Sequence, residues 1–71
     1  MDVTAEMTAL VWKIIVKAGD NVEEEEVLLI LESMKMEIPV ISPASMKVRS
    51  VLVAEGESVN EGQSLVVLDE R

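Results

Sequence analysis

The sequence lacks the residues on which most catalytic nucleophiles and bases depend. It has no cysteine, no histidine and no tyrosine, and Trp12 is its only aromatic residue. Without cysteine the chain forms no disulfide and no thiolate metal site, which suits a reducing compartment and leads us to expect a cytoplasmic protein. Without histidine, the usual general base near neutral pH, the common serine and cysteine nucleophile systems are excluded. We therefore expect no catalytic residue and no metal site.

Long apolar runs and basic clusters are missing as well. The longest apolar run covers only residues 27–31, whereas a membrane span needs roughly 18 residues, so we expect no span. Met1 is followed by Asp2 and Glu6 rather than by a basic region, so we expect no targeting peptide. Six basic residues are scattered among 14 acidic ones, for a net charge of −8. Nucleic acid binding needs clustered Lys and Arg. We expect no nucleic-acid or membrane partner, and a charge that favours a monomer.

An internal repeat is the most informative pattern that is present. Residues 11–32 align without a gap with residues 48–69, at a constant offset of 37, and seven of the 22 aligned pairs are identical. Two copies are too few for a solenoid, which needs about three, so the repeat predicts two half-domains related by a pseudo-two-fold axis. The 71 residues, 49% of them hydrophobic, leave room for one small core. We expect a single domain over residues 1–71.

The helix-forming composition of residues 22–37 competes with this repeat. The matching segment of the second copy contains Gly62 and the β-branched pair Val66-Val67, which favour a strand, and two halves aligned without a gap should share one structure. Turns are expected at Gly19-Asp20 and Gly56-Glu57, because glycine tolerates positive φ. We expect an all-β sandwich or flattened barrel, with strands over residues 3–6, 11–16, 27–32, 37–41, 48–53 and 65–69.

Residues 33–40 lie between the two copies and are not repeated, which predicts that they lie at one pole and the termini toward the other. In this segment Lys35 stands between Met34 and Met36. On strand alternation the methionines share a face and Lys35 points the other way, and a tight turn would push the lysine further into solvent. An exposed lysine is mostly an ammonium and needs a partner enzyme to react, so Lys35 is interpreted as a substrate for modification. The alternative is that the methionines fill the core and Lys35 is an ordinary solvated lysine.

The acidic residues outside this segment allow two interpretations. Residues 23–26 are four consecutive glutamates, for which a metal-binding or docking role is open, although a solvated turn is the more ordinary explanation. Asp20 and Glu57 each follow a glycine. We expect them to form turns rather than to act as acid and base catalysts.

These features together resemble the biotinyl/lipoyl attachment domain family, and specifically its biotin carrier branch. The resemblance covers essentially the whole chain. It is carried by the segment ESMKMEIP at residues 32–39, by Gly19-Asp20 with Val22, by Glu55-Gly56 with Val59 and by Glu61-Gly62. The resemblance implies a flattened barrel of two four-stranded antiparallel sheets, with the modified lysine on a hairpin turn. It implies covalent biotin on Lys35, recognition by the flanking Met34 and Met36, and Glu32, Ser33 and Glu37 as candidate ligase contacts.

The function implied by the resemblance is that of a carrier, not of an enzyme on its own. A biotin protein ligase would join biotin to Lys35 through an amide, and the tethered biotin would carry a carboxyl group between a biotin carboxylase and a carboxyltransferase. Two alternatives stay open: a carrier of lipoate, or of either group, and an acidic interaction module whose lysine is never modified. The flanking methionines favour biotin, because lipoyl domains usually have Asp before the lysine and Ala or Val after it.

Three positions depart from the family pattern. Members usually have glycine where this chain has Ala9 and Met46, and commonly where it has Glu25. Ala9 and Met46 are counterparts in the repeat. If they kept positive φ, each would cost on the order of 1–2 kcal/mol. We therefore expect either a less stable fold or rebuilt local turns.

Overall fold

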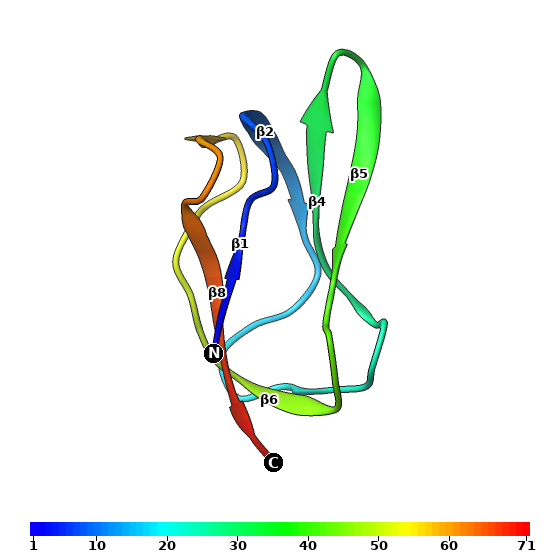
Figure 1. The fold of residues 1–71 in the computed structure, drawn as a ribbon, viewed down its shortest axis with the longest axis vertical. Helices are drawn as coiled ribbons and strands as arrows, with labels where there is room; N and C mark the ends of the chain where they lie inside the picture. Colours follow the sequence, from blue (N-terminus) through cyan, green and yellow to red (C-terminus); the bar gives the residue numbers. More distant parts are fainter.

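The computed structural model describes residues 1–71 as eight strands and no helix. The strands are β1 (Asp2–Thr4), β2 (Ala9–Ile14), β3 (Asn21–Val22), β4 (Val27–Ser33), β5 (Met36–Ile41), β6 (Met46–Val51), β7 (Ser58–Val59) and β8 (Ser64–Glu70). They form two antiparallel sheets with strand orders β1-β8-β6-β3 and β5-β4-β2-β7 (Figure 1). The predicted fold class is confirmed. No segment forms a helix long and apolar enough to cross a membrane.

The two sheets are related by the offset found in the sequence. Adding 37 to the bounds of β2, β3 and β4 gives the bounds of β6, β7 and β8, and β1 corresponds to the second half of β5. Replacing each strand by its counterpart converts one sheet order into the other. The irregularities match too, since the register of β2 shifts at Trp12 and that of β6 at Arg49. The pseudo-two-fold arrangement is confirmed.

The unrepeated segment and the chain termini lie toward opposite poles, as predicted. Figure 1 shows the hairpin of β4 and β5 projecting at one end of the long axis, and both termini in the other half of the molecule. The N-terminal ammonium donates a hydrogen bond to the carbonyl of Leu68, 2.8 Å away. This bond holds the N-terminus beside β8, in the half of the molecule away from the tip of the hairpin.

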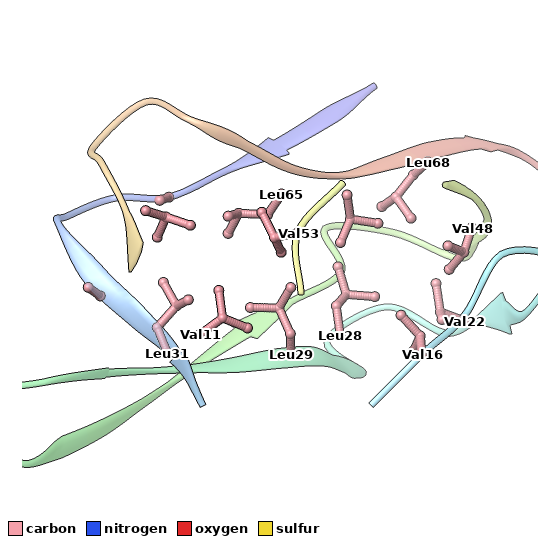
Figure 2. Packing of buried hydrophobic residues seen from close by; sticks show 14 residues of the cluster. Val11, Val16, Val22, Leu28, Leu29, Leu31, Val48, Val53, Leu65 and Leu68 are labelled. Carbon is pink, nitrogen blue, oxygen red and sulfur yellow. The ribbon is translucent and has the colours of Figure 1, made fainter. Parts of the chain in front are cut away.

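A single aliphatic core holds the two sheets together. Leu29 and Leu31 of β4 and Leu65 and Leu68 of β8 are almost fully buried, and Figure 2 shows side chains from the two sheets pointing toward one another. The cluster has 14 members: Ala5, Ala9, Val11, Val16, Val22, Leu28, Leu29, Leu31, Val48, Val53, Val59, Leu65, Val66 and Leu68. Each fully buried leucine or valine side chain stabilises the fold by roughly 1.5–3 kcal/mol. Six of these residues come from residues 11–32 and six from their counterparts in residues 48–69, and Ala5 and Ala9 complete the core.

The strand ends differ from those predicted. The strands expected over residues 11–16 and 48–53 begin and end two residues earlier, as β2 and β6, and the strand expected over 3–6 is β1. After β2 the backbone N–H groups of Ile15 and Val16 both donate to the carbonyl of Leu28, at 3.0 and 3.3 Å, because the chain is crossing to the other sheet to form β3. The two-residue strands β3 and β7 were not predicted, since they are too short for an alternating pattern.

Four turns of one design connect the strands, over residues 17–20, 23–26, 54–57 and 60–63. In each, the fourth residue's N–H donates to the first residue's carbonyl at 3.0–3.1 Å. Its side chain accepts a hydrogen bond from the first residue's N–H at 2.9–3.1 Å. The third residue has positive φ, as in a type II turn, and it is glycine in three turns and Glu25, with φ 69°, in the fourth. The predicted glycine turns are confirmed, and the four glutamates form a solvated turn.

The other two departures from the family pattern are accommodated without positive φ. Ala9 and Met46 open β2 and β6, and neither has a positive φ. Ala9 lies opposite Val59, and Met46 lies opposite Val22. The local backbone is therefore extended, so the strain of 1–2 kcal/mol considered for these positions does not arise. Of the three departures from the family pattern, only Glu25 has a positive φ.

Candidate functional site

A two-residue turn closes the hairpin of β4 and β5. Ser33 pairs with Met36 at the end of the ladder, which leaves Met34 and Lys35 as the turn. Their φ values are 52° and 65°, the pattern of a type I′ turn, in which Asn and Gly are the preferred residues. Methionine and lysine in this conformation cost about 1 kcal/mol each or more. Strain of this kind is common where a turn is under functional constraint.

The side chains of the turn stand free in solvent. Met34 is 92% exposed and Met36 65% exposed, so the alternative in which the methionines fill the core is wrong. Lys35 is exposed, and neither of the two ion pairs in the structure involves it. The hairpin therefore presents an accessible amine between two accessible thioethers.

Two carboxylates lie just below the turn. Glu32 of β4 pairs with Glu37 of β5 on one side and with Leu10 of β2 on the other. Neither glutamate forms an ion pair, and like charges directly opposite each other destabilise a sheet slightly. The structure brings together at one hairpin all of the predicted site residues, which are Glu32, Ser33, Met34, Lys35, Met36 and Glu37.

A pocket of about 150 Å³ lies to one side of this hairpin. It is lined by Val3, Thr4, Glu6, Met7, Leu31, Ile38, Pro39, Val40 and Ile41. Sequence reasoning did not find it, because β1 and β5 belong to different sheets and are brought together only by the tertiary fold. Lys35 is not in the lining. Nor does the structure gather three or more acidic side chains in a geometry that could hold a metal ion.

Comparisons of the sequence with known proteins agree with this geometry. Residues 2–68 match the family described as "Biotin-requiring enzyme". The chain is 47% identical over 68 residues to a "Biotin/lipoyl attachment protein" of Bacillus subtilis, covering 96% of this chain and 93% of that protein. It is 36% identical over 64 residues to a "Biotin carboxyl carrier protein" of Streptococcus mutans, covering 90% of this chain and 49% of that one.

Solved structures of large carboxylases contain the same fold. The urea carboxylase of Kluyveromyces lactis matches with a TM-score of 0.89 and 32% identity, over 96% of this chain and 6% of the carboxylase. A single-chain, multi-domain long-chain acyl-CoA carboxylase matches with a TM-score of 0.92 and 25% identity, over all of this chain and 7% of the carboxylase. This chain therefore spans only a small part of those proteins. From its family match, its relatives and its hairpin lysine, the chain belongs to the biotin/lipoyl attachment family, in the branch of biotin carrier proteins.

Proposed function

We propose that this protein is a biotin carrier whose biotin is joined through an amide to the Nζ of Lys35. The observation that carries the proposal is the place of Lys35 at the tip of the projecting hairpin, exposed and outside both ion pairs. Amide formation requires an accessible amine, and the exposed Met34 and Met36 leave the approach to it open. The bound biotin would supply the carboxyl-transfer chemistry, and the protein would supply presentation and recognition.

The hairpin presents the amine but does not activate it. Neither Glu32 nor Glu37 is paired with Lys35, so no side chain of this protein is placed to remove the proton from the ammonium. An acylating enzyme has to do so, and a biotin protein ligase is the enzyme that fits. The type I′ turn fixes the direction in which the lysine leaves the backbone, and its flexible four-carbon stem gives the tethered group reach.

The partners after modification would be a biotin carboxylase and a carboxyltransferase. A group on a flexible arm has a high effective concentration at each partner's site, which favours one carrier serving two enzymes. We also propose that the isolated protein is a monomer, since its net charge of −8 opposes self-association. The exposed methionines on both sides of Lys35 favour biotin over lipoate as the attached group.

Intact-mass measurement tests this function. The protein is incubated with ATP, biotin and a biotin protein ligase, and in parallel with ATP, lipoate and a lipoate ligase. We expect one biotinyl group, mapped to Lys35 by peptide analysis, and no lipoyl group. Lys35→Arg should fold and remain unmodified, while the control Lys17→Arg, at another exposed lysine, should be modified like the parent. Biotin on another lysine, or no modification of folded protein, would contradict the proposal.

A further inference from the structure

The outer face of the sheet that bears Lys35 carries a strip of hydrophobic residues. Side chains paired across antiparallel strands lie on the same face. Leu10 pairs with Glu32, and Ile30, two residues before Glu32, pairs with Pro39. Trp12 lies two residues after Leu10 and is 43% exposed, while Leu10 is 37% exposed. We call Leu10, Trp12, Ile30 and Pro39 the apolar strip.

The other sheet provides an internal control for this surface, because the pseudo-two-fold axis relates each position of one face to a position of the other. Of the four strip positions, only Ile30 has an apolar counterpart, Val67. The counterparts of Leu10, Trp12 and Pro39 are Lys47, Arg49 and Asp2. The same backbone thus folds with polar residues at these places. The fold therefore does not require apolar residues at these positions, and exposed apolar patches of this kind mark interaction sites.

The two faces also differ in how their carboxylates are paired. On the polar face Asp69 accepts a hydrogen bond from Arg49 Nε at 3.0 Å. Its counterpart Glu32 lies between Leu10 and Glu37 and has no cationic partner. Lys13, which pairs with Ile30 on this face, holds its Nζ 5.9 Å from the centre of the Trp12 ring and forms no ion pair with either glutamate. The two glutamates at the hairpin end of the strip, without a paired cation, are complementary to a protein surface with an apolar centre and flanking cations.

We infer that the apolar strip is a docking surface for the biotin protein ligase, which would meet it with an apolar patch flanked by arginine or lysine. The inference rests on the proposed function of Lys35. A lysine side chain extends roughly 6 Å from its Cα. Leu10 is level with Glu32 and Glu37, and Glu37 is two residues from Lys35, or about 7 Å along the strand. A ligase that brings its active site to the unmodified Nζ must therefore come close enough to the hairpin to cover the strip.

Other occupants fit this surface less well. A second copy of the chain would bring another net charge of −8 and a second pair of unpaired glutamates to the same interface, which opposes association. An enzyme that acts on the biotin-bearing protein meets a group at the end of a much longer arm. Such an enzyme can stay farther from the sheet, so the geometry favours the ligase.

Rates of biotinylation test the inference. The double variant Leu10→Gln with Trp12→Gln removes the two exposed strip residues of β2 without changing the charge. The matched control is Ile15→Gln with Leu52→Gln, which removes two exposed hydrophobic residues outside the strip. We expect the strip variant to lose at least tenfold in kcat/KM, mainly through KM, because the strip lies away from the reacting amine. The control should stay within twofold of the parent, and thermal unfolding checks that both variants are folded.

Four outcomes would overturn the inference. The first is an unchanged kcat/KM in the strip variant, and the second is an equal loss in the control. The third is a strip variant that is biotinylated normally but is a poorer substrate for a biotin carboxylase, which would assign the strip to that enzyme. The fourth is a parent dimer, seen by sedimentation, that the strip variant dissociates. If the ligase does not modify the parent protein at all, both the proposed function and this inference are contradicted. That result is observed before any variant is compared.

Discussion

Glu25 holds in its turn the position that Gly62 holds 37 residues later, and both have positive φ, 69° and 86°. Their backbone partners correspond as well. The N–H of Glu25 donates to the carbonyl of Ser42 and the N–H of Gly62 to that of Ala5, both at 2.8 Å. A side chain with a Cβ costs about 1–2 kcal/mol in this conformation, and glycine does not. The first half of the repeat therefore stores strain that the second half lacks.

Glu25→Gly should raise the free energy of unfolding by about 1 kcal/mol. The gain is smaller than the strain itself, because glycine also has more conformational freedom in the unfolded chain. The reverse change, Gly62→Glu, should lower the free energy of unfolding by a similar amount, since a Cβ at Gly62 would contact nothing within 4 Å and only the backbone is strained. Urea unfolding measures both, and Glu24→Gln isolates the effect of removing one charge from the acidic turn. Equal stability of Glu25→Gly and the parent would mean that the positive φ carries no cost.

Met34→Asn should make the fold more stable and the protein a poorer acceptor of biotin. Asparagine adopts positive φ more readily than methionine, and Met34 is 92% exposed, so no packing is lost. We expect a gain of about 0.5–1 kcal/mol in urea unfolding, together with a lower kcat/KM for biotinylation. Met36→Asn is the control, since Met36 lies in β5 without positive φ and its replacement should not stabilise. A Met34→Asn protein that is biotinylated at the parent rate would show that the methionine is not recognised.

The repeat predicted more of this fold than local propensity did. Residues 22–37 have the composition of a helix, yet β4 is a strand because it occupies the place of β8 in the other half. The offset also gave the two-fold arrangement of the sheets. It could not give the end of β2 at Ile14, because that end is set by the bonds of Ile15 and Val16 to Leu28 as the chain crosses between sheets.

The candidate site was predictable only where it is continuous in sequence. Lys35 and its neighbours lie on one hairpin, so a local motif was enough to find them. Leu10 and Trp12 are more than 20 residues away and reach the base of the hairpin only through the register of β2 against β4. That register depends on an irregularity at Trp12, which no periodic pattern reveals. The apolar strip is therefore a property of the folded sheet.

Leu68→Ala should unfold a large fraction of the protein. Leu68 is completely buried between the sheets, and removing a buried leucine side chain costs about 2–5 kcal/mol. A chain of 71 residues has a total stability of only several kcal/mol by general scaling. Circular dichroism during thermal unfolding should show a large fall in Tm, while Val67→Ala, one residue away on the outer side of β8, should change it little. Comparable losses for the two variants would contradict the placement of Leu68 inside the core and of Val67 outside it.

Ser42→Ala should cost about 1 kcal/mol and no more. Ser42 is the single buried polar residue, and its Oγ donates a hydrogen bond to the carbonyl of Ala44 at 2.6 Å. Its counterpart Ala5 is 2% exposed and makes the equivalent backbone bonds, so alanine fits the place and only the hydroxyl's bond is lost. The reverse change, Ala5→Ser, adds a hydroxyl near Met7, the counterpart of Ala44. A buried hydroxyl without an acceptor is costly, and we expect Ala5→Ser to lower the free energy of unfolding more than Ser42→Ala does. Urea unfolding of the two variants compares them, and a neutral Ser42→Ala would mean that water replaces the hydroxyl at the Ala44 carbonyl.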